Sequence, residues 1–294
     1  MKRLLTLLLM FSAIFTTLHA EDAPVWSDER GTWTHTVESP HQAGPTTVEI
    51  LLPDKYDKEK RYPVVYLLPV EANGGTKFGD GIKMARQQGI HNRQDVILAA
   101  PTFTATPWFA NHPTDPKIRQ EDYLIETVIP LVEKNYSTPA TAEGRWLLGF
   151  SKSGWGALTL ILLHPEVFGY AASWDAPLMM TEEQFGVWGT ADDFGTAENM
   201  AKYLPSKLIE THAGPFRERE RLIISGSNKF GTFSDKKFPY VGAPHTEAFH
   251  ELAEKNGVKH FYEPGINFTH AWAHKWMNPL VAKLAELAKL PNKP

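Results

Sequence analysis

The sequence predicts an α/β fold with a mostly parallel, doubly wound sheet and helices on both faces. Two observations predict it. Short, uninterrupted apolar runs recur along the chain, which is typical of parallel strands buried on both faces. Helical stretches separate these runs, and strands that alternate with helices favour a parallel sheet.

The strands fall into two groups. Residues 33–37 and 46–52 alternate between apolar and polar side chains, so we expect them to form an opening antiparallel pair. The apolar runs that follow are expected to form the parallel strands, at residues 62–68, 95–100, 145–148, 170–173, 222–225 and 259–262.

Helices are expected between the strands, at residues 81–88, 123–134, 157–164 and 246–256. A last helix is expected to begin at Pro279, with Leu280, Leu284 and Leu287 facing inward. Two long, aromatic segments at residues 103–116 and 179–195 interrupt the alternation. In a parallel sheet such insertions are expected over the carboxyl ends of the strands, where ligands bind.

The start of the chain is typical of a secretory signal peptide. Lys2 and Arg3 precede a short apolar core, and Ala20 offers a small residue for cleavage before Glu21. The alternative is an uncleaved membrane anchor, for which the core is short. We therefore expect a signal peptide at residues 1–20, a single domain at 21–294, and a secreted or periplasmic protein without stable membrane insertion.

Composition excludes several classes of function. The formal net charge is −4 and no basic stripe is present, so a nucleic-acid partner is not expected. The chain has no cysteine, which rules out disulfides and thiolate metal sites. Its histidines lack the spacing of metal ligands, so neither a metal nor a cofactor is expected. The oligomeric state stays open.

A serine flanked by small residues is the main chemical signal. Gly149-Phe150-Ser151 follows the apolar run at 145–148 and precedes a helical stretch, the context that a nucleophile elbow requires. Ser153 stands where a second glycine is usual. The order predicts Ser151 as a nucleophile, with the backbone N–H of Lys152 aimed at an oxyanion. The Lys152 side chain is either solvated or turned toward the site, where it would favour anionic substrates.

A late histidine completes the pattern. His270 lies in the loop after the last predicted strand, which is where a general base is expected in this order of elements. The alternative is a surface or capping histidine.

These motifs together resemble the esterase D or Putative esterase family of α/β-hydrolases. The resemblance extends from Tyr62 to Trp276 and includes the strand at 62–68, the elbow, the His164-Pro165 segment and His270-Ala271-Trp272. It implies the α/β-hydrolase fold and a serine esterase with a Ser-His-Asp triad. Members include S-formylglutathione hydrolases and feruloyl and acetyl-xylan esterases, so the resemblance implies a small-molecule or sugar ester as substrate.

Two site roles depart from the family pattern. A His-Gly pair usually follows the strand at 62–68, but this chain has Pro69-Val70-Glu71, so the second oxyanion donor is expected from Val70 or Glu71. The family's usual acid position, after the strand at 222–225, holds no carboxylate. Asp175 at the preceding strand's end is favoured over Asp235, because a strand end is stiffer than a loop.

The sequence leaves alternatives open for the substrate-binding residues and for the reaction. Trp108, Trp174 and Trp272 are candidate substrate-binding residues, and each could equally pack in the core. The sequence favours a secreted serine esterase. An acyltransferase using the same triad, or a binding protein on a hydrolase scaffold, stays as an alternative.

Overall fold

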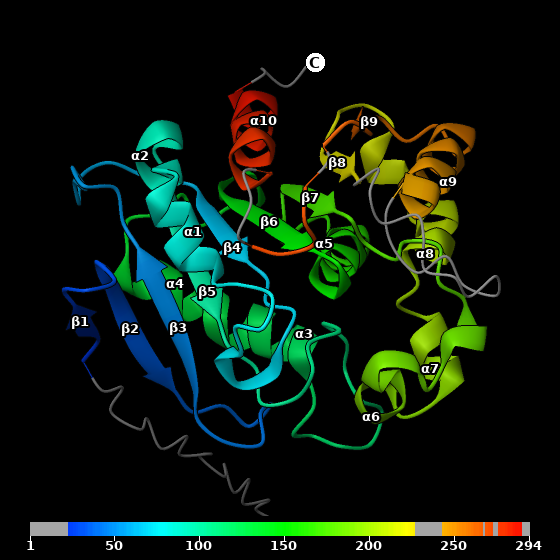
Figure 1. The fold of residues 1–294 in the computed structure, drawn as a ribbon, viewed down its shortest axis with the longest axis horizontal. Helices are drawn as coiled ribbons and strands as arrows, with labels where there is room; N and C mark the ends of the chain where they lie inside the picture. Colours follow the sequence, from blue (N-terminus) through cyan, green and yellow to red (C-terminus); the bar gives the residue numbers. More distant parts are fainter. Residues whose placement is uncertain (1–22, 227–242, 267, 273–275, 290–294) are drawn as a thin grey trace, which may run out of the picture.

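A nine-stranded sheet forms the centre of the protein (Figure 1). The structure is a computed structural model, and it describes residues 23–226, 243–266, 268–272 and 276–289. The strand order is β1-β2-β3-β5-β4-β6-β7-β8-β9. The strands are β1 (Val25–Ser27), β2 (Thr32–Val37), β3 (Thr46–Leu51), β4 (Val64–Leu67), β5 (Ile97–Pro101), β6 (Arg145–Phe150), β7 (Tyr170–Trp174), β8 (Leu222–Ser225) and β9 (His260–Glu263).

The mode of strand pairing changes once across the sheet, at β5. β1, β2, β3 and β5 pair antiparallel, and the strands from β5 through β4 and β6 to β9 pair parallel. The predicted fold class is therefore confirmed, and each predicted strand corresponds to one in the sheet. β1 was not predicted, because three residues are too few to show a periodic pattern.

Helices of the described residues cover both faces of the sheet. The α-helices are α1 (Gly81–Gln87), α2 (Ile90–Gln94), α3 (Gln120–Asp122), α4 (Ile129–Asn135), α5 (Lys152–Leu163), α6 (Thr190–Phe194), α7 (Ala197–Ala201), α8 (Pro205–Thr211), α9 (Ala243–Lys255) and α10 (Met277–Lys289). A π-helix (Tyr123–Val128) joins α3 to α4.

Alternate residues of the central strands serve two separate apolar cores. In β4, Val64 and Tyr66 face the core that contains α4, α5 and α8, whereas Val65 and Leu67 face the core that contains α1 and α10. All four are buried, which explains why the strand reads as a continuous apolar run.

Helix α5 begins five residues earlier than the sequence indicated. Its first five residues include Gly154 and Gly156, which disfavour a helix. At Gly156 a Cβ atom would lie 2.1 Å from Cδ2 of Phe109, so the glycine makes room for the insertion at 103–116. Helix α10 likewise starts at Met277, two residues before the predicted Pro279.

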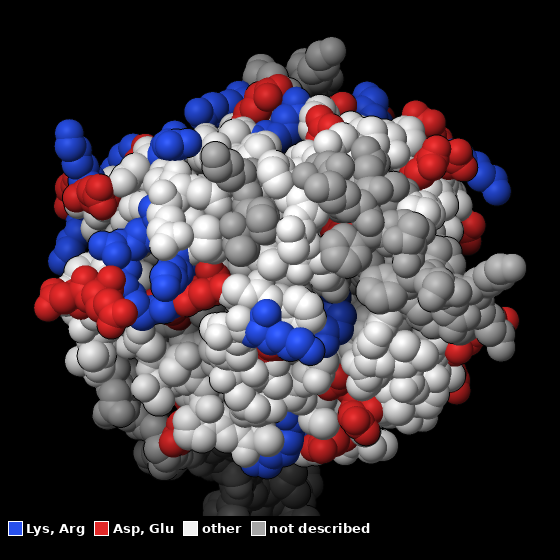
Figure 2. All heavy atoms as spheres, in the orientation of Figure 1, with Lys and Arg blue, Asp and Glu red and all other residues white. Residues whose placement is uncertain are grey.

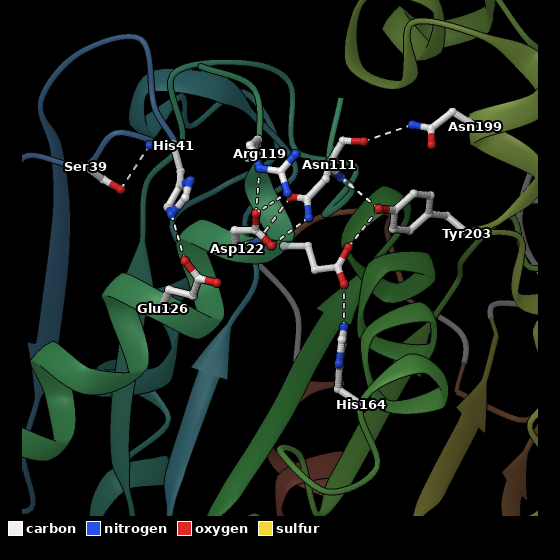
Figure 3. Close-up of polar contacts among 10 residues, drawn as sticks. Ser39, His41, Asn111, Arg119, Asp122, Glu126, His164, Asn199 and Tyr203 are labelled. Carbon is white, nitrogen blue, oxygen red and sulfur yellow. Dashed lines mark hydrogen bonds and ion pairs between the residues drawn. The ribbon is translucent and has the colours of Figure 1, made fainter. Parts of the chain in front are cut away.

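A polar network ties the insertion at 103–116 and helix α7 to the scaffold (Figure 3). Glu121 in α3 is bonded to His164 at the end of α5 (2.5 Å) and accepts a hydrogen bond from the Tyr203 hydroxyl (2.8 Å). The backbone N–H of Asn111 donates to the same hydroxyl, and Asn199 of α7 donates to the Asn111 carbonyl (2.9 Å). The segments around 111 and 199 are therefore fixed to each other and to α5.

The predicted signal peptide lies outside the described residues. Among the helices that are described, none has both the length and the apolar character needed to cross a bilayer.

Candidate active site

Ser151 occupies a strained turn between β6 and α5. Its backbone has φ 53° and ψ −130°, which a side-chain-bearing residue adopts only where its surroundings impose it. Its N–H donates to the Trp174 carbonyl of β7 at 3.1 Å. At Gly149 a Cβ would lie 2.2 Å from the Ser153 carbonyl oxygen, so only glycine fits there. This geometry is that of a nucleophile elbow.

Ser153 closes the turn from inside. Its side chain is buried, and its hydroxyl accepts from the Phe150 N–H (3.0 Å) and donates to the Phe150 carbonyl (2.9 Å). The hydroxyl therefore satisfies two backbone groups that the tight turn leaves without partners. The sequence showed only that Ser153 is small enough for the turn.

His270 and Asp175 are brought together from distant parts of the chain. Nδ1 of His270, in the loop after β9, lies 2.6 Å from Oδ2 of Asp175 at the end of β7. A carboxylate can only accept, so Nδ1 carries the proton in this bond and Nε2 is the nitrogen able to accept one. Asp235, the alternative acid, lies outside the described residues.

Asp175 is held as firmly as Ser151. The residue has no exposed surface and a φ of 51°, and its N–H donates to the Ser225 carbonyl of β8 at 2.9 Å. A buried carboxylate that is paired in this way orients an imidazole and stabilises its protonated form.

Aromatic rings enclose the imidazole. The ring of Phe150, the residue before Ser151, lies 5.1 Å from that of His270 between centroids, and Trp174 lies 6.3 Å away. Trp174 is stacked on Trp276 at 4.9 Å, and Trp272 packs on the same ring at 5.2 Å. Phe150 and Trp174 therefore pack against His270, and Trp174 is itself held by Trp276.

The three tryptophans predicted to bind substrate are buried: Trp108 and Trp174 completely, and Trp272 at 4% exposure. Trp108 packs edge-on against Trp155, and its indole N–H donates to the Trp188 carbonyl at 3.3 Å. The observed contacts of all three are packing contacts and, for Trp108 and Trp174, hydrogen bonds within the protein. Direct contact of these rings with a substrate stays a prediction.

The predicted oxyanion donors lie on two segments. Lys152 is the first residue of α5, and the first N–H groups of a helix have no intrahelical acceptor. Val70 and Glu71 lie three and four residues after the end of β4, and neither backbone N–H makes a hydrogen bond to the described residues. The Glu71 carboxylate turns back to accept from the Phe78 N–H at 3.1 Å.

An acid that the sequence did not single out lies near Lys152. Asp193 in α6 is 2% exposed, and burial raises the pKa of its carboxyl to about 7, although Lys152 opposes this. Burial lowers the pKa of the Lys152 ammonium, against the charges of Asp193 and Glu71. Asp192-Asp193 reads in sequence as a solvated acidic pair, and only the three-dimensional packing shows that its second member is buried.

The sheet is that of the α/β-hydrolase fold, and the chain order Ser151, Asp175, His270 is the order in which that fold carries its serine, acid and histidine. The chain matches the family described as Putative esterase over residues 39–287. It therefore belongs to this esterase family.

Curated relatives and solved structures agree with the family. The chain is 30% identical over 147 residues to Esterase MT1326 of Mycobacterium tuberculosis (strain CDC 1551 / Oshkosh), a match that covers 48% of this chain and 31% of that protein. It thus spans about a third of the length of this relative.

Two solved structures illustrate the shared fold. A ferulic acid esterase superposes with a TM-score of 0.64 at 17% identity, over 88% of this chain and 97% of that one. An S-formylglutathione hydrolase from Agrobacterium tumefaciens superposes with a TM-score of 0.65 at 14% identity, over 92% and 100%.

Proposed function

We propose that the protein is a serine hydrolase that cleaves a carboxylic ester through an acyl-enzyme. The observation that carries the proposal is the 2.6 Å contact between His270 and Asp175, together with the strained elbow turn at Ser151. Family membership supports the same activity.

The reaction follows from the roles of these groups. The Ser151 hydroxyl attacks the ester carbonyl while Nε2 of His270 takes its proton. The tetrahedral oxyanion accepts hydrogen bonds from the N–H of Lys152 and from Val70 or Glu71. His270 then donates its proton to the departing alcohol. Water, activated by the same imidazole, releases the acid from Ser151.

Labelling with a fluorophosphonate tests the nucleophile directly, because the reagent reacts with an activated serine. The wild type and Ser153→Gly are expected to be labelled, whereas Ser151→Ala is not. If Ser151→Ala is still labelled, or if Ser153→Gly is not labelled, the assignment of Ser151 as the nucleophile is wrong. A folded wild type that resists the reagent and turns over no ester would favour the binding-protein alternative.

The acid is tested by Asp175→Asn. The amide keeps the shape of the carboxylate but cannot stabilise the imidazolium. The value of kcat on an accepted ester should therefore fall by a factor on the order of ten thousand, the loss expected when the aspartate of a serine-protease triad becomes asparagine. A fall of less than tenfold in a folded variant would remove Asp175 from the proposed triad.

Export is also proposed, on the strength of the signal-like pattern at residues 1–20. Mass spectrometry of the protein expressed in a bacterial host should find a mature N-terminus at Glu21 in the periplasmic or extracellular fraction. A full-length protein in the cytoplasm would contradict this proposal.

A further inference from the structure

A lysine stands directly beside the proposed nucleophile. Lys152 follows Ser151 in the chain, and its side chain is half-buried. Its ammonium nitrogen lies 5.9 Å from the centroid of the Trp108 ring. Among the described residues, this nitrogen has no hydrogen-bond acceptor and no carboxylate within ion-pair distance.

Two carboxylates act on this ammonium without touching it. Glu71 is engaged with the Phe78 N–H in its own loop. Asp193 belongs to α6, and its Oδ2 is buried without a hydrogen-bond partner in the described part of the chain. Its Oδ1 lies at 3.5 Å from Gln120, the limit of a hydrogen bond. Within the described part of the chain, the Lys152 cation is therefore only partly compensated.

A partly desolvated charge without a contacting counter-ion is unfavourable, and an incoming anion relieves that penalty. Figure 2 shows a small group of Lys and Arg side chains near the middle of the displayed face, bordered mainly by uncharged surface. The partial burial of Lys152 favours recognition of a negative group on a substrate, because a partly buried ion pair is screened less than one in water.

We propose that Lys152 makes this active site selective for esters that carry a carboxylate a few bonds from the reacting carbonyl. The proposal rests on the proposed function, because it places the carboxylate relative to an ester held at Ser151. The ammonium donates to that carboxylate, while the backbone N–H of the same residue serves the oxyanion.

Asp193 makes the selectivity depend on pH. Lys152 and the neighbouring Asp192 are the charged groups that act on Asp193, and Asp193 and Glu71 are those that act on Lys152. Below about pH 7 the Asp193 carboxyl holds its proton, so it does not compete for the ammonium. Above that pH its negative charge opposes a substrate carboxylate, and the preference for anionic esters weakens.

Two matched pairs of esters test the proposal. The first places the carboxylate on the acyl part: mono-para-nitrophenyl adipate against para-nitrophenyl hexanoate. The second places it on the alcohol part: para-acetoxybenzoate against para-acetoxybenzamide. The readout is the ratio of kcat/KM for the charged ester to that for the neutral ester, which cancels effects common to both substrates.

For at least one pair, Lys152→Met should lower the ratio about tenfold or more, as expected for the loss of a charged hydrogen bond. Lys152→Arg should retain most of it. Lys77→Met removes an exposed lysine that lies over the Phe78 ring, and it should leave the ratio within twofold. A ratio in Lys152→Met that equals the wild-type value for both pairs would overturn the proposal.

The pH arm separates recognition by Lys152 from a general electrostatic effect. The wild-type ratio should fall between pH 6 and pH 8, and this fall should disappear in Asp193→Asn. An equal fall in both proteins would show that Asp193 does not control the ammonium, and would overturn this part of the proposal.

Binding distinguishes failure of this inference from failure of the proposed function. Calorimetric titration of adipate and para-acetoxybenzoate into Ser151→Ala requires no turnover. At least one Kd should rise about tenfold in Ser151→Ala/Lys152→Met. If each ligand binds Ser151→Ala and Ser151→Ala/Lys152→Met with the same Kd, the lysine site is refuted, even if the wild type hydrolyses neutral esters. If the double variant binds more weakly but the wild type cleaves no ester, the proposed esterase activity is refuted and the carboxylate site at Lys152 is retained.

Discussion

Asp193→Asn is expected to stabilise the protein at pH 8 and to do so much less at pH 5. The reason is burial, which raises the pKa of the Asp193 carboxyl from an ordinary 3.8 to about 7 in the folded state. Between these values the folded state holds a proton that the unfolded chain has released. The folded state therefore loses stability as the pH rises through this window, the reverse of the usual behaviour of an ion-paired aspartate.

The magnitude follows from the two pKa values. Proton linkage between 3.8 and about 7 gives a loss of roughly 2.5 kcal/mol in the free energy of unfolding between pH 5 and pH 8. Asparagine has nearly the same shape and does not titrate, so the variant lacks this contribution. The stability difference between variant and wild type should thus grow by about 2.5 kcal/mol over that range.

Urea unfolding followed by tryptophan fluorescence measures the difference at each pH. Asp192→Asn is the matched control, because Asp192 is the exposed neighbour in the same helix and its removal should change the difference far less. If the difference between Asp193→Asn and wild type is the same at pH 5 and pH 8, Asp193 titrates normally. Its role beside Lys152 would then have to be abandoned.

Two further predictions concern the scaffold. Gly156→Ala should lower the free energy of unfolding, measured with urea, by about 1–3 kcal/mol, because the new methyl group would overlap Phe109. Gly214→Ala is the control: a Cβ there meets nothing within 4 Å, so the free energy of unfolding should change by less than about 0.5 kcal/mol. Burial is the largest influence on the pKa of His164 and lowers it, but Glu121 and Glu166 together outweigh burial, so the pKa is raised. The ion pair with Glu121 therefore stabilises the fold below about pH 6.5, and this stabilisation is lost as the pH rises through the raised pKa. His164→Gln should therefore cost about 1.5 kcal/mol at pH 5.5 and less at pH 9, and a cost that does not vary with pH would contradict the ion pair.

The sheet could be predicted from the sequence because its signals are local. The buried central strands read as apolar runs, and the elbow is marked by Gly149 beside Ser151. The choice of Asp175 followed from the stiffness of a strand end, and the structure places this carboxylate against His270.

Other features depend on contacts between distant segments. Gly154 and Gly156 made the start of α5 unrecognisable in the sequence. The requirement for glycine comes from Ser173 and Ala176 at Gly154, and from Phe109, almost fifty residues earlier, at Gly156. The π-helix at Tyr123–Val128 has no distinct sequence pattern. Asp193 is buried in α6, where Phe194 packs on Trp108 of the insertion at 103–116 and Gln120 of α3 approaches the carboxylate; no sequence periodicity indicates these contacts.

The backbone bonds of Ser151 and Asp175 have a consequence for engineering. Each residue donates its N–H to the last carbonyl of the adjacent strand, Trp174 in β7 and Ser225 in β8. The two side chains are thus set by the relative stagger of three neighbouring strands, and neither loop carries the arrangement by itself. Grafting these loops onto another α/β protein would reproduce the site only where that protein has strands of the same length and stagger.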